Sequence, residues 1–339
     1  MHSTALPIAL TPGEPAGVAP EITAMAWLAL RDHPSLRFFL IGDCARYRER
    51  AVLAGIKIEW KEVKTASEAC SVFPLALPVQ QRSLAADSIA GKPDTCNAAA
   101  VISAIDDAVD YCLRGEAAAM VTNPIQKETL YGAGFKFQGH TDYLGHLARQ
   151  RGYSAHDVMM LVAGDLKAIP LTVHIPLAKV PAAISTEEIV AQAHVVAKEL
   201  KSCFRIAEPR LAVTGLNPHA GESGAMGMEE ITIISPAIKL LQAEGMNIIG
   251  PLPADTAFHA QARQEYDAII CMYHDQALIP AKTIDFHGGV NATLGLPFIR
   301  TSPDHGTALG IAGTGKANPA SLIAALTLAH QMANNRLAT

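Results

Sequence analysis

The strongest constraint on the fold is a short apolar run that recurs along the chain and ends each time in turn-forming or polar residues. The runs are FFLIGD ending at Asp43, AAAMVTNP ending at Pro124, AIPLTVHIP ending at Pro176, RLAVTGLNP ending at Pro218 and DAIICMYHD ending at Asp275. Runs that are apolar almost throughout are typical of strands buried on both faces of a parallel sheet. Stretches with helical apolar spacing lie between them, such as 97–113 and 186–204, and predict the crossovers that parallel strands require. The chain is therefore predicted to be α/β.

The length of the chain, 339 residues, favours two packed α/β domains that share a cleft. No repeat, low-complexity tract or Gly/Ser-rich linker interrupts the sequence, so we expect the chain to cross between domains without a tether. Half of the residues are apolar and only 17% are charged, which favours a large hidden surface. We therefore expect a homodimer.

The net charge of -5 gives no cationic field, and the lysines and arginines are scattered, so nucleic acid is not an expected partner. The first residues, MHSTALPIALTPGEPAG, lack the basic start of a signal peptide, and no apolar run approaches the ~20 residues of a membrane span. The six cysteines form no CxxC pair. We expect a cytoplasmic protein.

Three histidines follow three of the predicted strands: His174 in LTVHIPL, His219 in GLNPHAGE and His274 in MYHDQ. The carboxyl ends of parallel strands meet at one edge of a sheet, where ligands usually bind. Neutral imidazoles with open remaining positions suit a catalytic zinc better than calcium or magnesium. Because 13 histidines occur in the chain, ordinary hydrogen-bonded histidines are an equally good interpretation from spacing alone.

Two further groups of polar residues are candidates for ligand binding. His140 and Thr141 follow a glycine in FQGHTDY, either as ligand contacts or as a helix start with Thr141 as its N-cap. Lys282, Asn291 and Arg300 lie in a Gly- and Thr-rich stretch and could clamp a phosphate or carboxylate, or be solvated surface groups.

The Gly/Pro-rich segment TPGEPAGVAPEI, residues 11–22, is similar in composition to a phosphate-binding loop. It has neither the GK[ST] ending of a Walker A motif nor GxGxxG spacing. The segment therefore does not predict a Rossmann domain.

Taken together, the motifs resemble the 4-hydroxythreonine-4-phosphate dehydrogenase family of vitamin B6 biosynthesis. The resemblance spans nearly the whole chain, through TPGEPAG, VTNPIQK, GHTDY, VHIPL, GLNPHAGE, GPLPADT, MYHDQ and GVNATLGLPFIRTSPDHGTALGIAG. LNPHAGE followed by GPLPADT and MYHDQ is the most specific part. Ala19 departs from the family, which often has glycine there.

The C-terminal stretch DHGTALGIAGTGKANPASLIAAL is similar to the signature of isocitrate and isopropylmalate dehydrogenases. This second resemblance implies two α/β/α domains with an interdomain cleft, and His305, Gly306 and Asn318 near a nicotinamide cofactor. The implied division is a cofactor-side domain of residues 1–135 plus 285–339 and a metal, substrate and dimerisation domain of residues 136–284.

The family resemblance implies that His174, His219 and His274 bind one divalent metal. Zinc is expected first, and cobalt, manganese and magnesium stay open. It also implies that the substrate is bound by the residues at the matching positions, His140, Thr141, Lys282, Asn291 and Arg300. A homodimer would share each site, with His174 and His219 from one subunit and His274 from the other.

The implied reaction is NAD(P)-dependent oxidation of 4-phosphohydroxy-L-threonine to 2-amino-3-oxo-4-phosphobutyrate, which loses CO₂ to give 3-amino-2-oxopropyl phosphate. Asp255 and Lys282 are the candidate catalytic residues, although Asp255 in PLPADT also fits a helix N-cap. Three alternatives stay open: a sister dehydrogenase for 4-phosphothreonate, 4-phosphoerythronate or a cyclic diol; a three-histidine zinc aldolase or hydrolase; and an idle sugar-phosphate binding protein. The last two would leave DHGTALGIAG or the metal histidines without a role.

Overall fold

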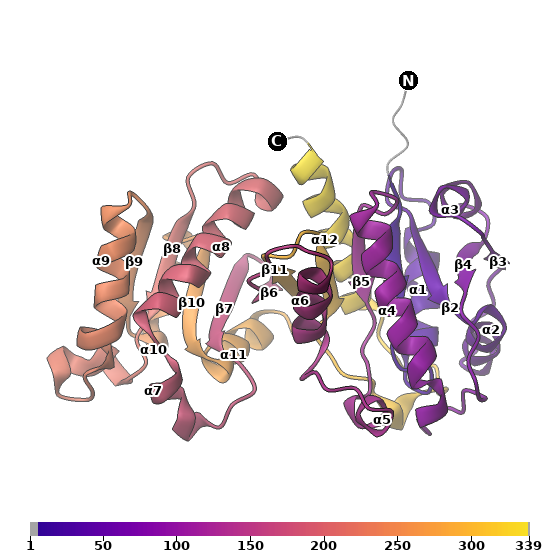
Figure 1. Ribbon diagram of the computed structural model, residues 1–339, viewed down its shortest axis with the longest axis horizontal. Helices are drawn as coiled ribbons and strands as arrows, with labels where there is room; N and C mark the ends of the chain where they lie inside the picture. Colours follow the sequence, from indigo (N-terminus) through magenta and orange to yellow (C-terminus); the bar gives the residue numbers. More distant parts are fainter. Residues whose placement is uncertain (1–5, 338–339) are drawn as a thin grey trace. The chain divides into compact units, whose positions relative to one another are not determined.

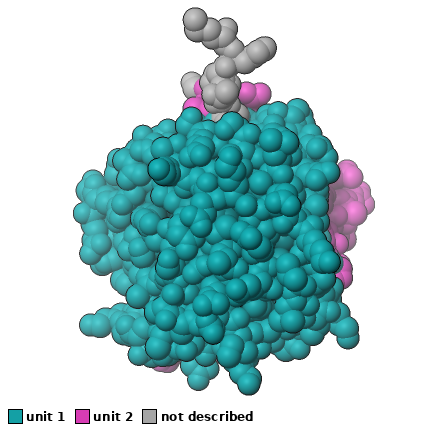
Figure 2. All heavy atoms as spheres, turned by 90° about the vertical axis from the view of Figure 1, so that its right-hand side faces the viewer, with its two compact units in different colours: residues 1–155, 296–334 teal, residues 156–295, 335–339 magenta. Residues whose placement is uncertain are grey.

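The computed structural model of the chain describes residues 6–337 and divides into two compact units (Figure 2). Unit 1 comprises residues 1–155 and 296–334, and unit 2 comprises residues 156–295 and 335–339. The chain leaves unit 1 later than residue 135 because the helix that follows packs into the core of unit 1 through Tyr143, Leu144 and Leu147.

Unit 1 is built on parallel strands in the order β3-β4-β2-β1-β5-β12. Figure 1 labels β2, β3, β4 and β5 of this group. These strands are β1 (Ile8–Thr11), β2 (Phe38–Gly42), β3 (Trp60–Glu62), β4 (Leu77–Gln81), β5 (Ala119–Thr122) and β12 (Arg300–Pro303). β1, β2 and β5 are buried throughout, as the apolar runs predict.

Helices of unit 1 cover both faces of these strands, which explains why the strands are apolar almost throughout. On one face, helices α3, α4 and α6 share a buried cluster with Ala9, Phe39 and Met120. On the other, Thr301 Oγ1 donates a 2.8 Å hydrogen bond to Ala325 O and attaches α12. The helices are α1 (Ala19–Leu30), α2 (Cys44–Leu53), α3 (Ala66–Val72), α4 (Ala98–Leu113), α5 (Lys127–Gly132), α6 (His140–Gln150) and α12 (Ala320–Leu337), of which the residues to 334 belong here.

Unit 2 has strands in the order β11-β6-β7-β10-β8-β9. β7, β10, β8 and β9 are parallel, whereas β6 runs antiparallel to both β7 and β11. The strands are β6 (Val158–Ala163), β7 (Leu166–Thr172), β8 (Arg210–Thr214), β9 (Asn247–Leu252), β10 (Ala268–Tyr273) and β11 (Val290–Leu294). The mostly parallel α/β class predicted from the sequence is confirmed.

The longest helix of unit 2 is α8 (Thr186–Phe204), which has the predicted bounds. Ser185 caps its start by accepting a 3.1 Å hydrogen bond from Glu188 N, and Arg205 ends it in the left-handed region. The other helices are α7 (Val180–Ala183), α9 (Ser235–Ala243), α10 (Ala254–Ala257) and α11 (His274–Ile284). Within residues 6–337, no helix is both long and apolar enough to cross a membrane.

A buried histidine in unit 1 predicts a pH-dependent stability. His330 Nε2 lies 3.0 Å from both Ser35 Oγ and Asn334 Nδ2, so it accepts from the Asn334 amide. Burial, and then the nearby His33 and Arg37, lower the pKa of His330 below its ordinary value of 6.5. The folded state therefore favours the neutral ring, and the free energy of unfolding should fall as pH drops below about 6.5.

We expect urea denaturation between pH 7 and pH 5 to show a smaller loss of stability in His330→Gln, because a glutamine amide keeps an acceptor and does not titrate. The exposed His287→Gln is the matched control and should keep the wild-type pH dependence. An unchanged profile in His330→Gln would show that another group controls this loss.

Candidate functional site

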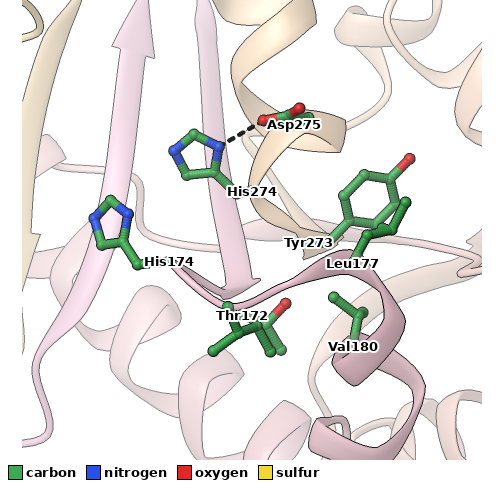
Figure 3. Close-up of a pocket in the computed structure, with 8 residues that line it drawn as sticks. Thr172, His174, Leu177, Val180, Tyr273, His274 and Asp275 are labelled. Carbon is green, nitrogen blue, oxygen red and sulfur yellow. Dashed lines mark hydrogen bonds and ion pairs between the residues drawn. The ribbon is translucent and has the colours of Figure 1, made fainter.

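The structure brings together two of the three predicted metal histidines. β7 and β10 are parallel neighbours with Thr172 opposite Tyr273, so the residues that follow them lie at one edge of the sheet. The rings of His174 and His274 have centroids 5.6 Å apart and an interplanar angle of 43° (Figure 3). Convergence of strand ends, one of the two interpretations that the spacing left open, is therefore found for this pair.

A carboxylate orients one ring of the pair. Asp275 Oδ1 lies 2.7 Å from Nδ1 of His274, which leaves Nε2 of that ring for another partner (Figure 3). A carboxylate on the far nitrogen of a histidine is the usual second partner of a metal-binding imidazole. The donor set therefore fits zinc or cobalt better than calcium or magnesium.

The pair lines a pocket at the carboxyl ends of β7 and β10. Its lining includes the apolar side chains of Leu177 and Val180, and the ring of Tyr273 lies beside Leu177 (Figure 3). Its lining residues are Thr172, His174, Ile175, Leu177, Val180, Tyr273, His274 and Asp275. In the part of the chain that the structure describes, no three His, Cys, Asp or Glu side chains are gathered closely enough to hold a metal ion.

His219 lies outside this lining, on an exposed loop after β8. Its Nδ1 lies 3.2 Å from Glu222 Oε2. The loop is strained, because residues 219–223 all have positive φ and only Gly221 among them lacks a β-carbon. His174 is also left-handed, with φ of 55°. Non-glycine residues in this region cost roughly 1–2 kcal/mol each, and such strain is often kept at functional sites.

In unit 1, Arg300 is a buried cation at the start of β12. Its Nη2 and Nε donate to Thr122 Oγ1 at 2.7 and 3.2 Å. Burial lowers the pKa of Arg300 to about 9, so the side chain is still positive at neutral pH. A buried cation of this kind is suited to an anionic ligand.

His140 adds a second group to this region. It is the first residue of α6, and Gly139 is the N-cap, so the interpretation of Thr141 as N-cap is wrong. Burial, then the charges of Arg300 and Lys127, keep the pKa of His140 well below its usual value. Thr122 and Lys127 were not predicted as site residues. Their place in the motif VTNPIQK was the one sequence signal that could have pointed to them.

Three of the buried polar atoms that find no partner among residues 6–337 belong to predicted binding residues: His140 Nε2, Asn291 Oδ1 and His305 Nε2. A buried polar atom without a hydrogen bond is costly, so these atoms fit positions that a ligand or water completes. Asn291 lies on β11 in unit 2, and His305 follows β12 in unit 1.

Two other predicted residues of unit 2 lie outside the pocket lining. Lys282 is on α11, with Nζ 5.7 Å from the ring centroid of Phe286. Asp255 is exposed in the first turn of α10, whose N-cap is Pro253, so its interpretation as an N-cap is wrong.

The predicted cofactor segment packs on the TPGEPAG loop. Val18 N donates to Thr307 O at 3.0 Å, and a β-carbon on Gly17 would lie 2.6 Å from the same oxygen. Residues 11–20 are buried, and the loop supports the neighbouring segment through this packing. Asn318 Oδ1 accepts from Ala320 N at 2.9 Å, at the start of α12, and Gly306 has open space around it.

Comparison with known proteins gives the family. The sequence model described as pyridoxal phosphate biosynthetic protein PdxA matches residues 35–329. The chain belongs to the PdxA family. A 4-hydroxythreonine-4-phosphate dehydrogenase of Bradyrhizobium diazoefficiens is 51% identical over 340 residues, which cover 98% of each chain.

Solved structures agree with this membership. A crystal structure of 4-hydroxythreonine-4-phosphate dehydrogenase from Klebsiella pneumoniae has a TM-score of 0.86 and 35% identity, and covers 98% of this chain and 99% of that one. A terephthalate 1,2-cis-dihydrodiol dehydrogenase from Burkholderia xenovorans has a TM-score of 0.64 and 25% identity, with coverage of 96% and 98%. The PdxA family predicted from the motifs is confirmed.

The left-handed loop of this PdxA-family chain gives a stability prediction of unusual sign. Ala220 has φ of 51°, where a β-carbon is unfavourable, so Ala220→Gly should be neutral or stabilise the protein by up to about 1 kcal/mol. Ala197→Gly, in the middle of α8, is the control and should cost about 1 kcal/mol. The denaturant midpoint should fall for Ala197→Gly and stay the same or rise for Ala220→Gly. An equal loss of unfolding free energy in both variants would contradict the left-handed conformation of Ala220.

Proposed function

We propose that the protein is a metal- and NAD(P)-dependent dehydrogenase that oxidises 4-phosphohydroxy-L-threonine to 2-amino-3-oxo-4-phosphobutyrate. Loss of CO₂ from this β-keto acid gives 3-amino-2-oxopropyl phosphate, on the route to pyridoxal 5'-phosphate. Membership of the PdxA family supports the pathway, and the names of the relatives support the substrate. The observation that carries the proposal is the imidazole pair at the ends of β7 and β10.

His174, His219 and His274 are the proposed ligands of one divalent metal, with zinc expected first and cobalt, manganese or magnesium as alternatives. A divalent metal would supply Lewis acidity, which favours removal of the proton from the substrate hydroxyl before hydride leaves the same carbon. In this chain, Asp275 holds the His274 ring by its Nδ1 and so fixes which nitrogen faces the pocket.

The anionic ends of the substrate are proposed to bind His140, Thr141, Lys282, Asn291 and Arg300. Support comes from the buried charge of Arg300 and from the buried, unpartnered atoms of His140 and Asn291. Thr122 orients the guanidinium of Arg300, so the cation presents a fixed geometry. Asp255 and Lys282 are the candidates for proton transfer, and the exposed carboxylate of Asp255 is free of the helix-cap role.

The nicotinamide cofactor is proposed to bind near His305, Gly306 and Asn318. His305 Nδ1 lies 2.8 Å from Gly306 O, while its Nε2 is buried without a partner among the described residues. That atom is suited to a polar group of a ligand.

We further propose a homodimer that shares its sites. The pair His174 and His274 meets within one chain, and a second subunit would add the ligand that the pair needs. Exposed apolar side chains of unit 2, including Leu177, Ile279 and Phe286, are suited to such an interface. The division expected from the resemblance, with His174 and His219 from one subunit and His274 from the other, is a different arrangement, in which the two rings of this pair would belong to different sites.

The test of the function is a spectrophotometric assay of nicotinamide reduction. We expect turnover with 4-phosphohydroxythreonine, loss of turnover with a chelator, and recovery on adding zinc or cobalt. 4-Phosphothreonate, 4-phosphoerythronate and a cis-dihydrodiol are the comparison substrates. Preference for one of these would identify a sister activity, and a complete lack of reduction would favour a non-redox aldolase or hydrolase.

Removal of the buried cation should weaken substrate binding selectively. Arg300→Met should raise KM for the phosphorylated substrate about ten- to hundredfold, because a charge-assisted contact contributes roughly 1.5–3 kcal/mol. KM for NAD(P) should change little. The exposed Arg149→Met is the control. If Arg300→Met binds substrate normally and loses cofactor affinity, Arg300 contacts the cofactor and not the substrate.

A further inference from the structure

The loop that carries His219 is attached to one buried carboxylate, that of Glu230. Glu230 is 2% exposed and begins the helical turn Glu230–Ile234. Its Oε1 accepts from Leu216 N at 2.8 Å and from Asn217 N at 2.7 Å. Its Oε2 accepts from Asn217 Nδ2 at 3.0 Å. Three donors of the LNPHAGE motif therefore converge on a single side chain.

The loop folds closely around this carboxylate. A β-carbon on Gly221 would lie 2.5 Å from Glu230 Oε2, and one on Gly215 would lie 3.0 Å from Oε1. Gly221 also has φ of 81°. The position therefore favours glycine for two reasons, the lack of space for a β-carbon and the positive φ. The carboxylate thus fills the inner side of the loop.

The loop also makes hydrogen bonds that do not involve Glu230. The left-handed run from His219 to Ser223 starts two residues after Asn217, and His219, Glu222 and Ser223 are exposed. Asn217 Nδ2 also donates to Glu229 Oε2 at 2.8 Å, and His219 Nδ1 lies 3.2 Å from Glu222 Oε2. The backbone bonds run from Ala220 N to Asn217 O at 3.1 Å, from Ala225 N to Glu222 O at 3.2 Å and from Met226 N to Gly221 O at 3.1 Å. An exposed left-handed run is unfavourable, and the residues directly before it, Leu216 and Asn217, are held by the buried Glu230. These bonds therefore help to set the direction in which His219 points.

We propose that Glu230 is a positioning residue for metal binding: it holds the loop in the conformation that presents the imidazole of His219 to a divalent cation. The inference rests on the proposed metal site. Glu230 does not touch the metal in this proposal, and acts through the backbone of Leu216 and Asn217. A side chain that orients a metal ligand in this way typically changes metal affinity about 10–100-fold.

The test is a titration of metal-free protein with Co²⁺, followed by its visible absorption. We expect Glu230→Ala to weaken Co²⁺ binding about 10–100-fold. Glu230→Gln should have an intermediate effect, because one oxygen can still accept from the two backbone N–H groups while the new amide faces the Asn217 donor. Glu208→Gln, an exposed carboxylate of the same unit, is the matched control and should bind like wild type.

A second measurement is independent of metal. Amide hydrogen exchange in metal-free protein should rise at residues 216–227 in Glu230→Ala and stay unchanged in the control. Wild-type Co²⁺ affinity and loop protection in folded Glu230→Gln and Glu230→Ala would overturn the role of Glu230 while leaving the metal site intact. Absence of Co²⁺ binding in wild type would instead overturn the proposed metal site, and this inference with it. If Glu230→Ala fails to fold, Glu230→Gln decides.

Discussion

The parallel pairing of β7 with β10 is the constraint on which the candidate site depends. It sets Thr172 opposite Tyr273, and the 2.8 Å hydrogen bond from Thr172 Oγ1 to Met272 O reinforces this register at the strand ends. Side chains that lie far apart in the sequence consequently meet without any long excursion of the backbone. A shift of one residue would turn every side chain of a strand to the opposite face, so the geometry of the site depends on this register.

Both units place energetically unfavourable groups where strands begin or end. In unit 1, the guanidinium of Arg300 is buried on β12 and bonded to Thr122 at the end of β5. In unit 2, a strained backbone and an exposed imidazole follow β8. Such features lower the stability of the free protein, and bound ligands can recover that free energy. The buried core provides the stability, and the candidate site residues lie at the strand termini.

The sequence predicted the α/β class because apolar runs of this kind have one physical explanation, burial on two faces. It predicted α8 to the residue from the helical spacing of its apolar residues, and the structure adds the Ser185 cap at its start. It did not predict that β6 runs antiparallel, since an apolar run carries no information on the direction of its neighbour. The proximity of His174 and His274 could be anticipated, because the carboxyl ends of parallel strands lie at one edge of a sheet. The left-handed loop could not, because His219, Ala220, Glu222 and Ser223 have no local preference for positive φ, and the bonds from Leu216 and Asn217 to Glu230 that precede the run are not legible in the sequence.

The place of β12 in unit 1 has a consequence for synthesis on the ribosome. β5 pairs with β1 on one side and with β12 on the other, but β12 emerges only after the whole of residues 156–295 has been translated. During that interval the edge of β5 has open backbone donors and acceptors, which are a template for pairing with another nascent chain. Translation speed and chaperone supply should therefore control the yield of this protein at that stage. A circular permutant that delivers residues 296–334 ahead of β1 would close the edge before unit 2 is made.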